Sequence, residues 1–201
     1  MVSAKLCDIS EIRPHLYLSG FGCITEKKLT QLGITNAVDV TNIPNNPRYS
    51  GIEYLNARVD DDVISNIGQY FEKVAEFVEQ TRKKLFVYRI VIIVEMSQKI
   101  PLNDRIIVIG GKTLIFCAAG VSRSAALCIM SLVINEGISL SDAFYDIYDK
   151  RPFISPNIGF WRQMIEFEEK QKGTSTVQLL KGMRRPIPDV YLKRRPTSAT
   201  E

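Results

Sequence analysis

The chain has 201 residues, of which 45% are hydrophobic and 24% charged, which suits one globular domain and excludes a chain that is disordered throughout. Residues 173–201 hold six basic and two acidic side chains, and six minus two accounts for the whole formal charge of +4. The preceding residues are therefore formally neutral, which argues against a nucleic-acid-binding domain.

The cysteines and the apolar segments exclude further classes of protein. The chain contains four cysteines, Cys7, Cys23, Cys117 and Cys128. They form no C-x-x-C pair, and His15 is the single histidine, so the spacing of a zinc site is missing. No apolar signal segment opens the chain, and its most apolar stretch, 85–94, is interrupted by Arg89. We expect a cytoplasmic or nuclear protein without membrane insertion, metal or cofactor.

Hydrophobic patterning predicts strands and helices that alternate along the chain. Strands are expected at 16–19, 37–40, 53–59 and 113–116, and helices at 25–32, 67–81, 124–135, 141–149 and 157–172. Gly33 is expected to end the first helix. This alternation predicts an α/β layered domain.

The segment 85–110 departs from the alternation. Two β-rich runs, 86–94 and 105–109, enclose a polar loop. They predict a possible extra β-hairpin, whose exposed edge would be prone to aggregation.

The run from Phe116 to Ser124 carries the chemistry. A strand delivers Cys117, five small residues form a loop, and Arg123 opens a helix. Tight curvature would turn the backbone N–H groups of the loop inward as a nest for an anion, with the helix N-terminus behind it. The residues expected to bind a phosphate group in this way are Ala118, Ala119, Gly120, Val121 and Ser122.

Three side chains of this run have predicted catalytic tasks. The positive field of the loop would lower the pKa of Cys117 and hold it as a nucleophilic thiolate. Arg123 can grip two phosphate oxygens in fork geometry, and Ser124 can donate a hydrogen bond to the sulfur when it leaves. A C-x5-R match also arises by chance around a structural cysteine, but the apolar strand, small loop and helix together favour the catalytic interpretation.

Cleavage of a phosphate ester also needs a proton donor for the departing oxygen. Because His15 is the only histidine, a carboxylate is the better candidate. The run Asp60-Asp61-Asp62 lies between a predicted strand and a predicted helix. Its spacing alone does not separate a catalytic role from helix capping or from a solvated acidic turn.

With these features the chain resembles a dual-specificity protein phosphatase of the small atypical kind, which lacks a kinase-docking domain. The matching motifs are the loop at 117–125, the opening strand at 12–20, the helix start at 68–71 and the late motif at 151–160. The resemblance implies a catalytic domain over 9–172, between an N-terminal tail at 1–8 and a basic C-terminal tail at 173–201. It implies a central mixed, mostly parallel sheet of about five strands flanked by helices. The basic run Lys181–Arg195 is expected to be solvated, with docking of an acidic partner or a nuclear address as the alternatives.

The resemblance also implies the reaction. Asp61, counted back from Tyr70-Phe71, would be the general acid, and Asn157 would support the loop. The reaction would be hydrolysis of phosphotyrosine and of phosphoserine or phosphothreonine through a cysteinyl-phosphate. Because the loop side chains carry no extra cations, a phosphoprotein is favoured over polyphosphorylated inositol or an RNA 5′-triphosphate.

Two features depart from the family pattern. The family has a histidine immediately before the nucleophile, which braces the loop by hydrogen bonds, whereas Phe116 packs but cannot donate. We therefore expect reduced activity, with a phosphate-binding pseudophosphatase as the alternative. The family also lacks a counterpart of 85–110, so this segment is either a genuine edge hairpin or an error of the gene model, such as translated intron.

Overall fold

The computed structural model describes residues 7–96, 111–180, 182 and 185–193, without the side chains of 84–96. A five-stranded sheet lies at its centre, in the order β1-β2-β5-β3-β4. The strands are β1 (Ser10–Arg13), β2 (Leu16–Gly20), β3 (Asn36–Asp39), β4 (Glu53–Asn56) and β5 (Thr113–Cys117). Strand β1 runs antiparallel to β2, and every other pair is parallel. The mixed, mostly parallel sheet of about five strands is confirmed.

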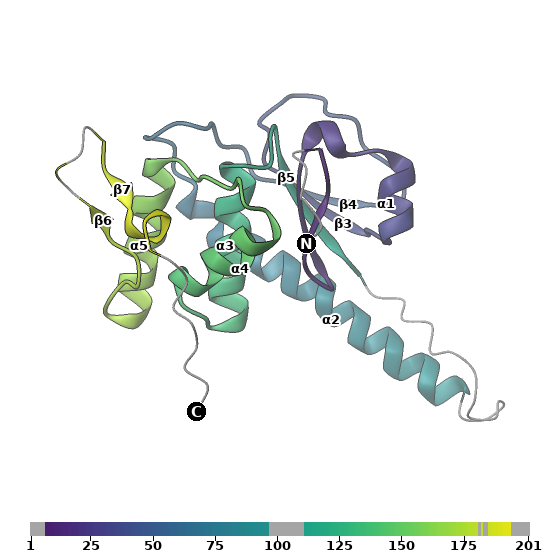
Figure 1. The fold of residues 1–201 in the computed structure, drawn as a ribbon. Helices are drawn as coiled ribbons and strands as arrows, with labels where there is room; N and C mark the ends of the chain where they lie inside the picture. The colour runs from purple at the N-terminus through teal and green to yellow at the C-terminus, as the bar shows by residue number, and fades with distance from the viewer. Residues whose placement is uncertain (1–6, 97–110, 181, 183–184, 194–201) are drawn as a thin grey trace.

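Helices cover both faces of this sheet (Figure 1). They are α1 (Glu26–Leu32), α2 (Phe71–Met96), α3 (Arg123–Glu136), α4 (Leu140–Lys150) and α5 (Ile158–Lys172), with 3-10 turns η1 (Phe21–Cys23), η2 (Gly68–Tyr70) and η3 (Asp189–Tyr191). Successive strand residues point to opposite faces. Ile115 accordingly joins the larger core beneath α2 to α5, whereas Leu114 and Phe116 join the smaller core beneath α1.

Local signals set the ends of α1 as the sequence predicts. The hydroxyl of Thr25 accepts a hydrogen bond from the Lys28 N–H at 3.3 Å, which satisfies one of the free donors of the first turn. At the other end Gly33 adopts a left-handed conformation with φ 69°, which glycine reaches without a steric cost. This short helix therefore begins and ends where its own capping residues stand.

The hairpin predicted at 85–110 is wrong in its first arm. Helix α2 continues without interruption to Met96, so residues 86–94 are helical. A helix already formed over the preceding turns offers each added residue a hydrogen-bond partner, and propagation does not carry the cost of nucleation. This context overrides the modest strand preference of β-branched residues. The second arm, 105–109, lies outside the described residues.

The solvated tail expected at Lys181–Arg195 is wrong for residues 187–191, which pack onto the domain, while the described residues on either side of them are exposed. Strands β6 (Leu179–Leu180) and β7 (Ile187–Pro188) form a small antiparallel ribbon that leads into η3. Val190 is buried, and the Tyr145 hydroxyl donates to its carbonyl oxygen at 3.2 Å. The basic charges of this segment obscured the few apolar residues that pack it onto the helices.

The candidate catalytic residues gather at the carboxyl ends of the parallel strands. In parallel sheets the loops that follow the carboxyl ends of the strands meet at the same edge. Cys117 is the last residue of the central strand β5, and β3 and β4 end beside it. Among the described helices, none is both long and apolar enough to cross a membrane.

Candidate active site

The segment between β5 and α3 is a tight loop whose carbonyl oxygens all face outward. Each carbonyl oxygen from Ala118 to Ser122 accepts a hydrogen bond. Backbone N–H groups donate to three of them: Phe21 to Ala118 at 3.1 Å, Ser155 to Val121 at 2.8 Å and Ala126 to Ser122 at 2.9 Å. Arg151 donates to the other two, Ala119 at 3.3 Å and Gly120 at 2.9 Å. Because the C=O and N–H of a trans peptide unit point in opposite directions, outward carbonyls turn the N–H groups toward the inside of the loop.

The sulfur of Cys117 lies at the centre of these N–H groups. The Gly120 N–H donates to Sγ at 3.2 Å, and the Ser124 hydroxyl donates at 3.1 Å. Burial acts to raise the pKa of Cys117, but the hydrogen bonds from the Ser124 hydroxyl and from the N–H groups of Ser124, Gly120 and Val121 outweigh it. The net effect is a pKa below the ordinary cysteine value, which favours the thiolate.

Two glycines allow the loop to rest directly on the end of β2. Gly120 has φ 71°, and a Cβ there would lie 2.4 Å from the carbonyl carbon of Ser19. A Cβ on Gly20 would in turn lie 2.8 Å from the backbone of Ala119. The curvature of the loop thus depends on a backbone contact that only glycine permits.

Arg123 begins α3 and is almost fully buried beside the loop. One guanidinium nitrogen, Nη1, donates to the carbonyl oxygens of Thr41 at 2.9 Å and Val59 at 3.3 Å. Its Nε is buried and has no hydrogen-bond partner among the described residues. A buried donor without an acceptor is costly, and an oxyanion held over Cys117 would supply one.

The structure brings Asp61, of the three consecutive aspartates, to this loop. Its Oδ1 accepts from the Ser122 hydroxyl at 2.7 Å and from the Asn157 amide at 2.8 Å. Its Oδ2 lies 3.5 Å from Nε of Arg123, and about a third of the side chain, 35%, is exposed. Asp61 therefore lies where a group bound over Cys117 could reach it.

The neighbouring aspartates have other partners. Asp60 accepts from the Asn42 amide at 2.7 Å, which ties the loop after β3 to the loop after β4. Asp62 accepts from the N–H groups of Ile64 at 2.9 Å and Ser65 at 2.7 Å and so closes a turn. These contacts hold the shape of the acidic loop on either side of Asp61.

Asn157 connects the late motif to the loop. It is the N-cap of α5, where its Oδ1 accepts from the Phe160 N–H at 3.1 Å. Its own N–H donates to the Ser122 hydroxyl at 3.1 Å, while its amide nitrogen donates to Asp61. Through its side chain and its backbone N–H, one residue thus connects a helix, the acidic loop and the phosphate-binding loop.

Phe116 occupies an apolar environment on the α1 side of the sheet. It is 3% exposed and stacks on Phe21, with ring centroids 6.2 Å apart. Its register partner on β2 is Ser19, whose hydroxyl is buried without a hydrogen-bond partner among the described residues. Position 116 therefore contributes packing and no hydrogen bond from its side chain to the catalytic loop.

Arg151 is a site residue that the sequence analysis missed. It is fully buried, and it provides the donors for the carbonyl oxygens of Ala119 and Gly120. The signal in the sequence was the arginine that opens the late motif, directly before Pro152. Nothing in the spacing of that motif, some thirty positions from Gly120, indicated that its guanidinium would reach the loop.

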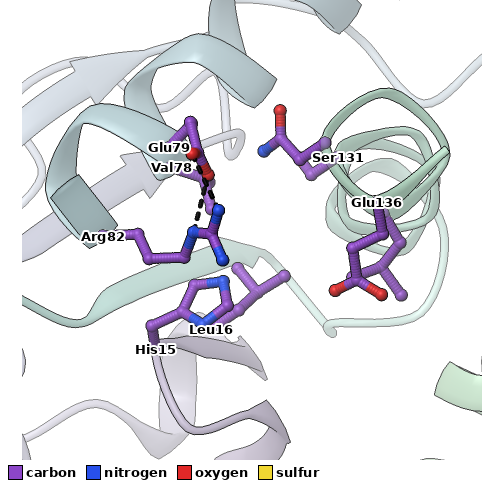
Figure 2. A pocket seen from close by; sticks show the side chains of 9 residues that line it. His15, Leu16, Val78, Glu79, Arg82, Ser131 and Glu136 are labelled. Atoms are coloured by element: carbon purple, nitrogen blue, oxygen red, sulfur yellow. Dashed lines mark hydrogen bonds and ion pairs between the residues drawn. The ribbon is translucent and has the colours of Figure 1, made fainter.

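His15 lies away from this site. With Glu79, Arg82 and Glu136 it lines a cavity of about 20 Å³ between β2, α2 and α3, large enough for one water molecule (Figure 2). Its carbonyl oxygen accepts from Thr113, the first residue of β5, whereas Cys117 is the last. Burial, followed by the charge of Arg82, lowers the pKa of His15. It packs in the fold and takes no part in the site.

Comparison with known proteins identifies relatives of this chain. A family model described as dual specificity phosphatase, catalytic domain, matches residues 95–170. Dual specificity protein phosphatase 18 of Rattus norvegicus is 33% identical over 190 residues, which cover 94% of this chain and 81% of that protein. Dual specificity protein phosphatase 14 of Homo sapiens is 33% identical over 186 residues, which cover 92% of this chain and 81% of the relative.

The fold has relatives among solved structures as well. The crystal structure of human DUSP28 superposes with a TM-score of 0.66 at 26% identity, covering 82% of this chain and 95% of that one. Its fold thus matches over most of both chains. Since the relatives of known sequence are a third identical along nearly the whole chain, the chain belongs to the dual-specificity protein phosphatase family.

Proposed function

We propose that this dual-specificity protein phosphatase works in two steps, through a cysteinyl-phosphate formed on Cys117. In the first step the Cys117 thiolate attacks phosphorus, the bond from phosphorus to the side-chain oxygen breaks, and Asp61 gives its proton to that oxygen. In the second, Asp61 takes a proton from water as the water attacks phosphorus. Inorganic phosphate departs, and the sulfur leaves as a thiolate that the Ser124 hydroxyl stabilises.

The arrangement of the loop carries this proposal. Five outward carbonyl groups between Ala118 and Ser122 leave a ring of N–H donors around a buried sulfur. A phosphate dianion over Cys117 would accept from those N–H groups and from the guanidinium of Arg123, whose Nε otherwise has no hydrogen-bond acceptor in the described structure. Donors fixed in advance around a developing charge stabilise the transition state without reorganisation.

The contacts of Asp61 support its role as the general acid. In the free site its two carboxylate oxygens face donors from Ser122, Asn157 and Arg123. A phosphate group that binds Arg123 would draw the guanidinium away from Oδ2 and place negative charge beside the carboxylate. With the guanidinium on the phosphate, the carboxyl group of Asp61 is left facing the leaving oxygen, where a general acid must stand.

Phosphorylated protein side chains are the substrates that the family acts on. Within the site, the side chains between Cys117 and Arg123 add no cation, which favours one phosphate group, on tyrosine, serine or threonine, over polyphosphorylated inositol or nucleic acid. A catalytic thiol also needs reducing surroundings, so we place the protein in the cytoplasm or the nucleus.

Phe116 favours a second candidate function, phosphate binding without hydrolysis. The apolar side chain lends no hydrogen bond to the loop, so the thiolate depends on the remaining donors. A site with reduced nucleophile reactivity would still hold a phosphorylated side chain through the loop and Arg123.

The test compares the wild-type protein with Cys117→Ser on one phosphotyrosyl and one phosphothreonyl peptide. Release of phosphate by the wild type alone supports the proposed mechanism. Binding of the peptides by both proteins without release of phosphate supports the second candidate. If neither protein binds or hydrolyses the peptides, the proposed use of this loop is wrong.

A further inference from the structure

Arg151 connects the back of the catalytic loop to the start of the chain. Its Nε donates to the Gly120 carbonyl oxygen at 2.9 Å and its Nη2 to that of Ala119 at 3.3 Å. Its Nη1 donates to the carbonyl oxygen of Asp8 at 2.9 Å and to the hydroxyl of Ser10 at 3.2 Å. The guanidinium is therefore held from both sides within the protein interior.

These bonds act on the orientation of two peptide groups. A cation that donates hydrogen bonds to the carbonyl oxygens of Ala119 and Gly120 favours the conformation in which those carbonyls point toward it. The N–H groups on the far side of these peptide units belong to Gly120 and Val121; that of Gly120 donates to Cys117 Sγ at 3.2 Å, and both lower the pKa of Cys117. Arg151 thus orders the donors that reach the sulfur, without touching the sulfur itself.

The charge of Arg151 acts on Cys117 as well. Burial lowers the pKa of Arg151, and negative charge on Cys23 and on Cys117 counters that effect by raising it. By reciprocity, the positive guanidinium favours the ionised form of Cys117. Beside the loop, Arg123 at the start of α3 pairs with Asp61 at 3.5 Å, and the charge of Arg151 also acts on Cys23 in η1.

We infer that Arg151 is the positioning residue that keeps the catalytic loop in its anion-binding form and Cys117 ionised in a site that lacks a histidine at position 116. Phe116 offers no polar atom, and the side chain of Arg151 donates to more carbonyl groups of the loop than any other described side chain does. The inference rests on the proposed function of Cys117, but it concerns the state of the free loop.

The shape of the side chain explains why arginine stands here. Its planar fork reaches two successive loop carbonyls and the N-terminal segment at once, and the guanidinium carbon lies 4.4 Å from the ring centroid of Phe153. Lysine would retain the charge but could not reproduce this set of bonds. Arg151→Lys therefore separates the effect of charge from that of loop geometry.

The experiment measures the ionisation of Cys117 in the full-length protein. The rate of Cys117 alkylation by iodoacetamide is followed against pH by peptide mass spectrometry in wild type, Arg151→Met and Arg151→Lys. Because only the thiolate reacts, loss of Arg151 should move the midpoint to higher pH, by about one pH unit or more for Arg151→Met and by less for Arg151→Lys. Binding of inorganic phosphate, measured by calorimetry, should weaken in parallel.

Arg13→Met serves as the matched control. Arg13 bonds to Glu136 at 2.9 Å and to Asp146, and so joins β1 to α3 and α4 without contact to the loop. Its loss should lower the melting temperature but leave the alkylation midpoint unchanged. A folded Arg151→Met or Arg151→Lys protein with the midpoint of the wild type would overturn the inference.

A second arm keeps the test decisive if Arg151→Met does not fold. Phe116→His restores a donor at position 116, so it should return the midpoint of Arg151→Lys toward the wild-type value. An unshifted midpoint for Arg151→Lys would contradict the inference even where Arg151→Met cannot be measured. The alkylation midpoint and phosphate binding do not depend on turnover. A protein that hydrolyses no phosphopeptide would therefore refute the proposed function, while the alkylation midpoints would still test the role of Arg151.

Discussion

Position 116 shows how a single side chain can tune the nucleophile. Across the sheet its register partners are Ser19 on β2 and Asp39 on β3, both polar and both buried. The Ser19 hydroxyl has no hydrogen-bond partner among the described residues, whereas Asp39 accepts from Thr41, Asn46 and Arg48. A histidine at 116 would therefore find one polar neighbour, the Ser19 hydroxyl, that the phenylalanine leaves unused.

We predict that Phe116→His raises kcat/KM and shifts the acidic limb of its pH profile to lower pH. Activity needs the thiolate, and a donor near the loop lowers the pKa of Cys117, so the active form is reached at a lower pH. The measurement is kcat/KM against pH on a phosphotyrosyl peptide. Phe116→Leu is the control, because it alters the ring without adding a donor. A histidine variant that follows the profile of the wild type would show that the side chain at 116 is neutral for ionisation.

Asp61 permits a second prediction for one residue. Asp61→Asn should lower kcat by about 100-fold or more on phenyl phosphate, whose leaving group needs a proton. The loss should be much smaller on 4-nitrophenyl phosphate, because its leaving group departs without one. Asp60→Asn is the matched control, since Asp60 bonds to Asn42 and not to the loop. Equal losses on both substrates would argue against a general acid at this position.

The three aspartates and Arg151 also show what the sequence could reveal about the site. The nucleophile loop is predictable because its chemistry lies within nine consecutive residues, from Phe116 to Ser124. Asp61 could be identified only through the resemblance to a family, because spacing alone does not distinguish three consecutive aspartates. Arg151 escaped prediction because its role depends on tertiary contacts that bring it to the carbonyls of Ala119 and Gly120.

At the scale of secondary-structure elements, the contact between the catalytic loop and β2 has a steric requirement that can be measured. Gly120 and Gly33 both have positive φ, 71° and 69°. A Cβ on Gly33 would meet no atom within 4 Å, whereas a Cβ on Gly120 would lie 2.4 Å from Ser19. The two positions share the same backbone strain and differ in the space around them.

Gly33→Ala should therefore destabilise the fold by about 1 kcal/mol through backbone strain alone. Gly120→Ala should cost about 1–3 kcal/mol more, because the backbone of β2 must move, and it should also reduce activity. Urea unfolding of the two variants measures the difference. Equal free energies of unfolding would mean that the loop can move off β2 without a loss of stability, and the close contact of Gly120 with Ser19 would then not matter for the fold.

The correct ends of α1 and the error at 86–94 show the difference between local and long-range determinants of structure. Thr25 and Gly33 determine the ends of α1 by local hydrogen bonds and backbone conformation, so the sequence around them suffices for prediction. In 86–94 the residues favour a strand, but α2 supplies the preceding turns and no strand partner among the described residues lies beside it. Strand pairing depends on distant partners, which local patterning cannot identify.

At the scale of the whole molecule, Gly111 brings the chain back beside Thr81 of α2 just before β5 begins. A Cβ on Gly111 would lie 2.8 Å from the carbonyl oxygen of Thr81, a buried residue of α2, and 3.2 Å from the hydroxyl of Thr35. Lys112 then bonds to Thr35 and enters β5. The two ends of the segment between Thr81 and Gly111 are therefore neighbours.

Removal of 85–110, with Lys84 joined to Gly111, should leave a folded and active protein. Residues 82–84 can turn from α2 to Gly111, and the junction lies at the start of β5, about 13 Å of strand from Cys117. We expect kcat/KM within about twofold of the full chain, since no catalytic contact changes, and a melting temperature within about 5 °C. Deletion of 141–150, which removes α4 from the core, is the control that should unfold. A shortened protein that fails to fold would show that 85–110 contributes to the core. The contact between Thr81 and Gly111 would then depend on that segment and not on the rest of the fold.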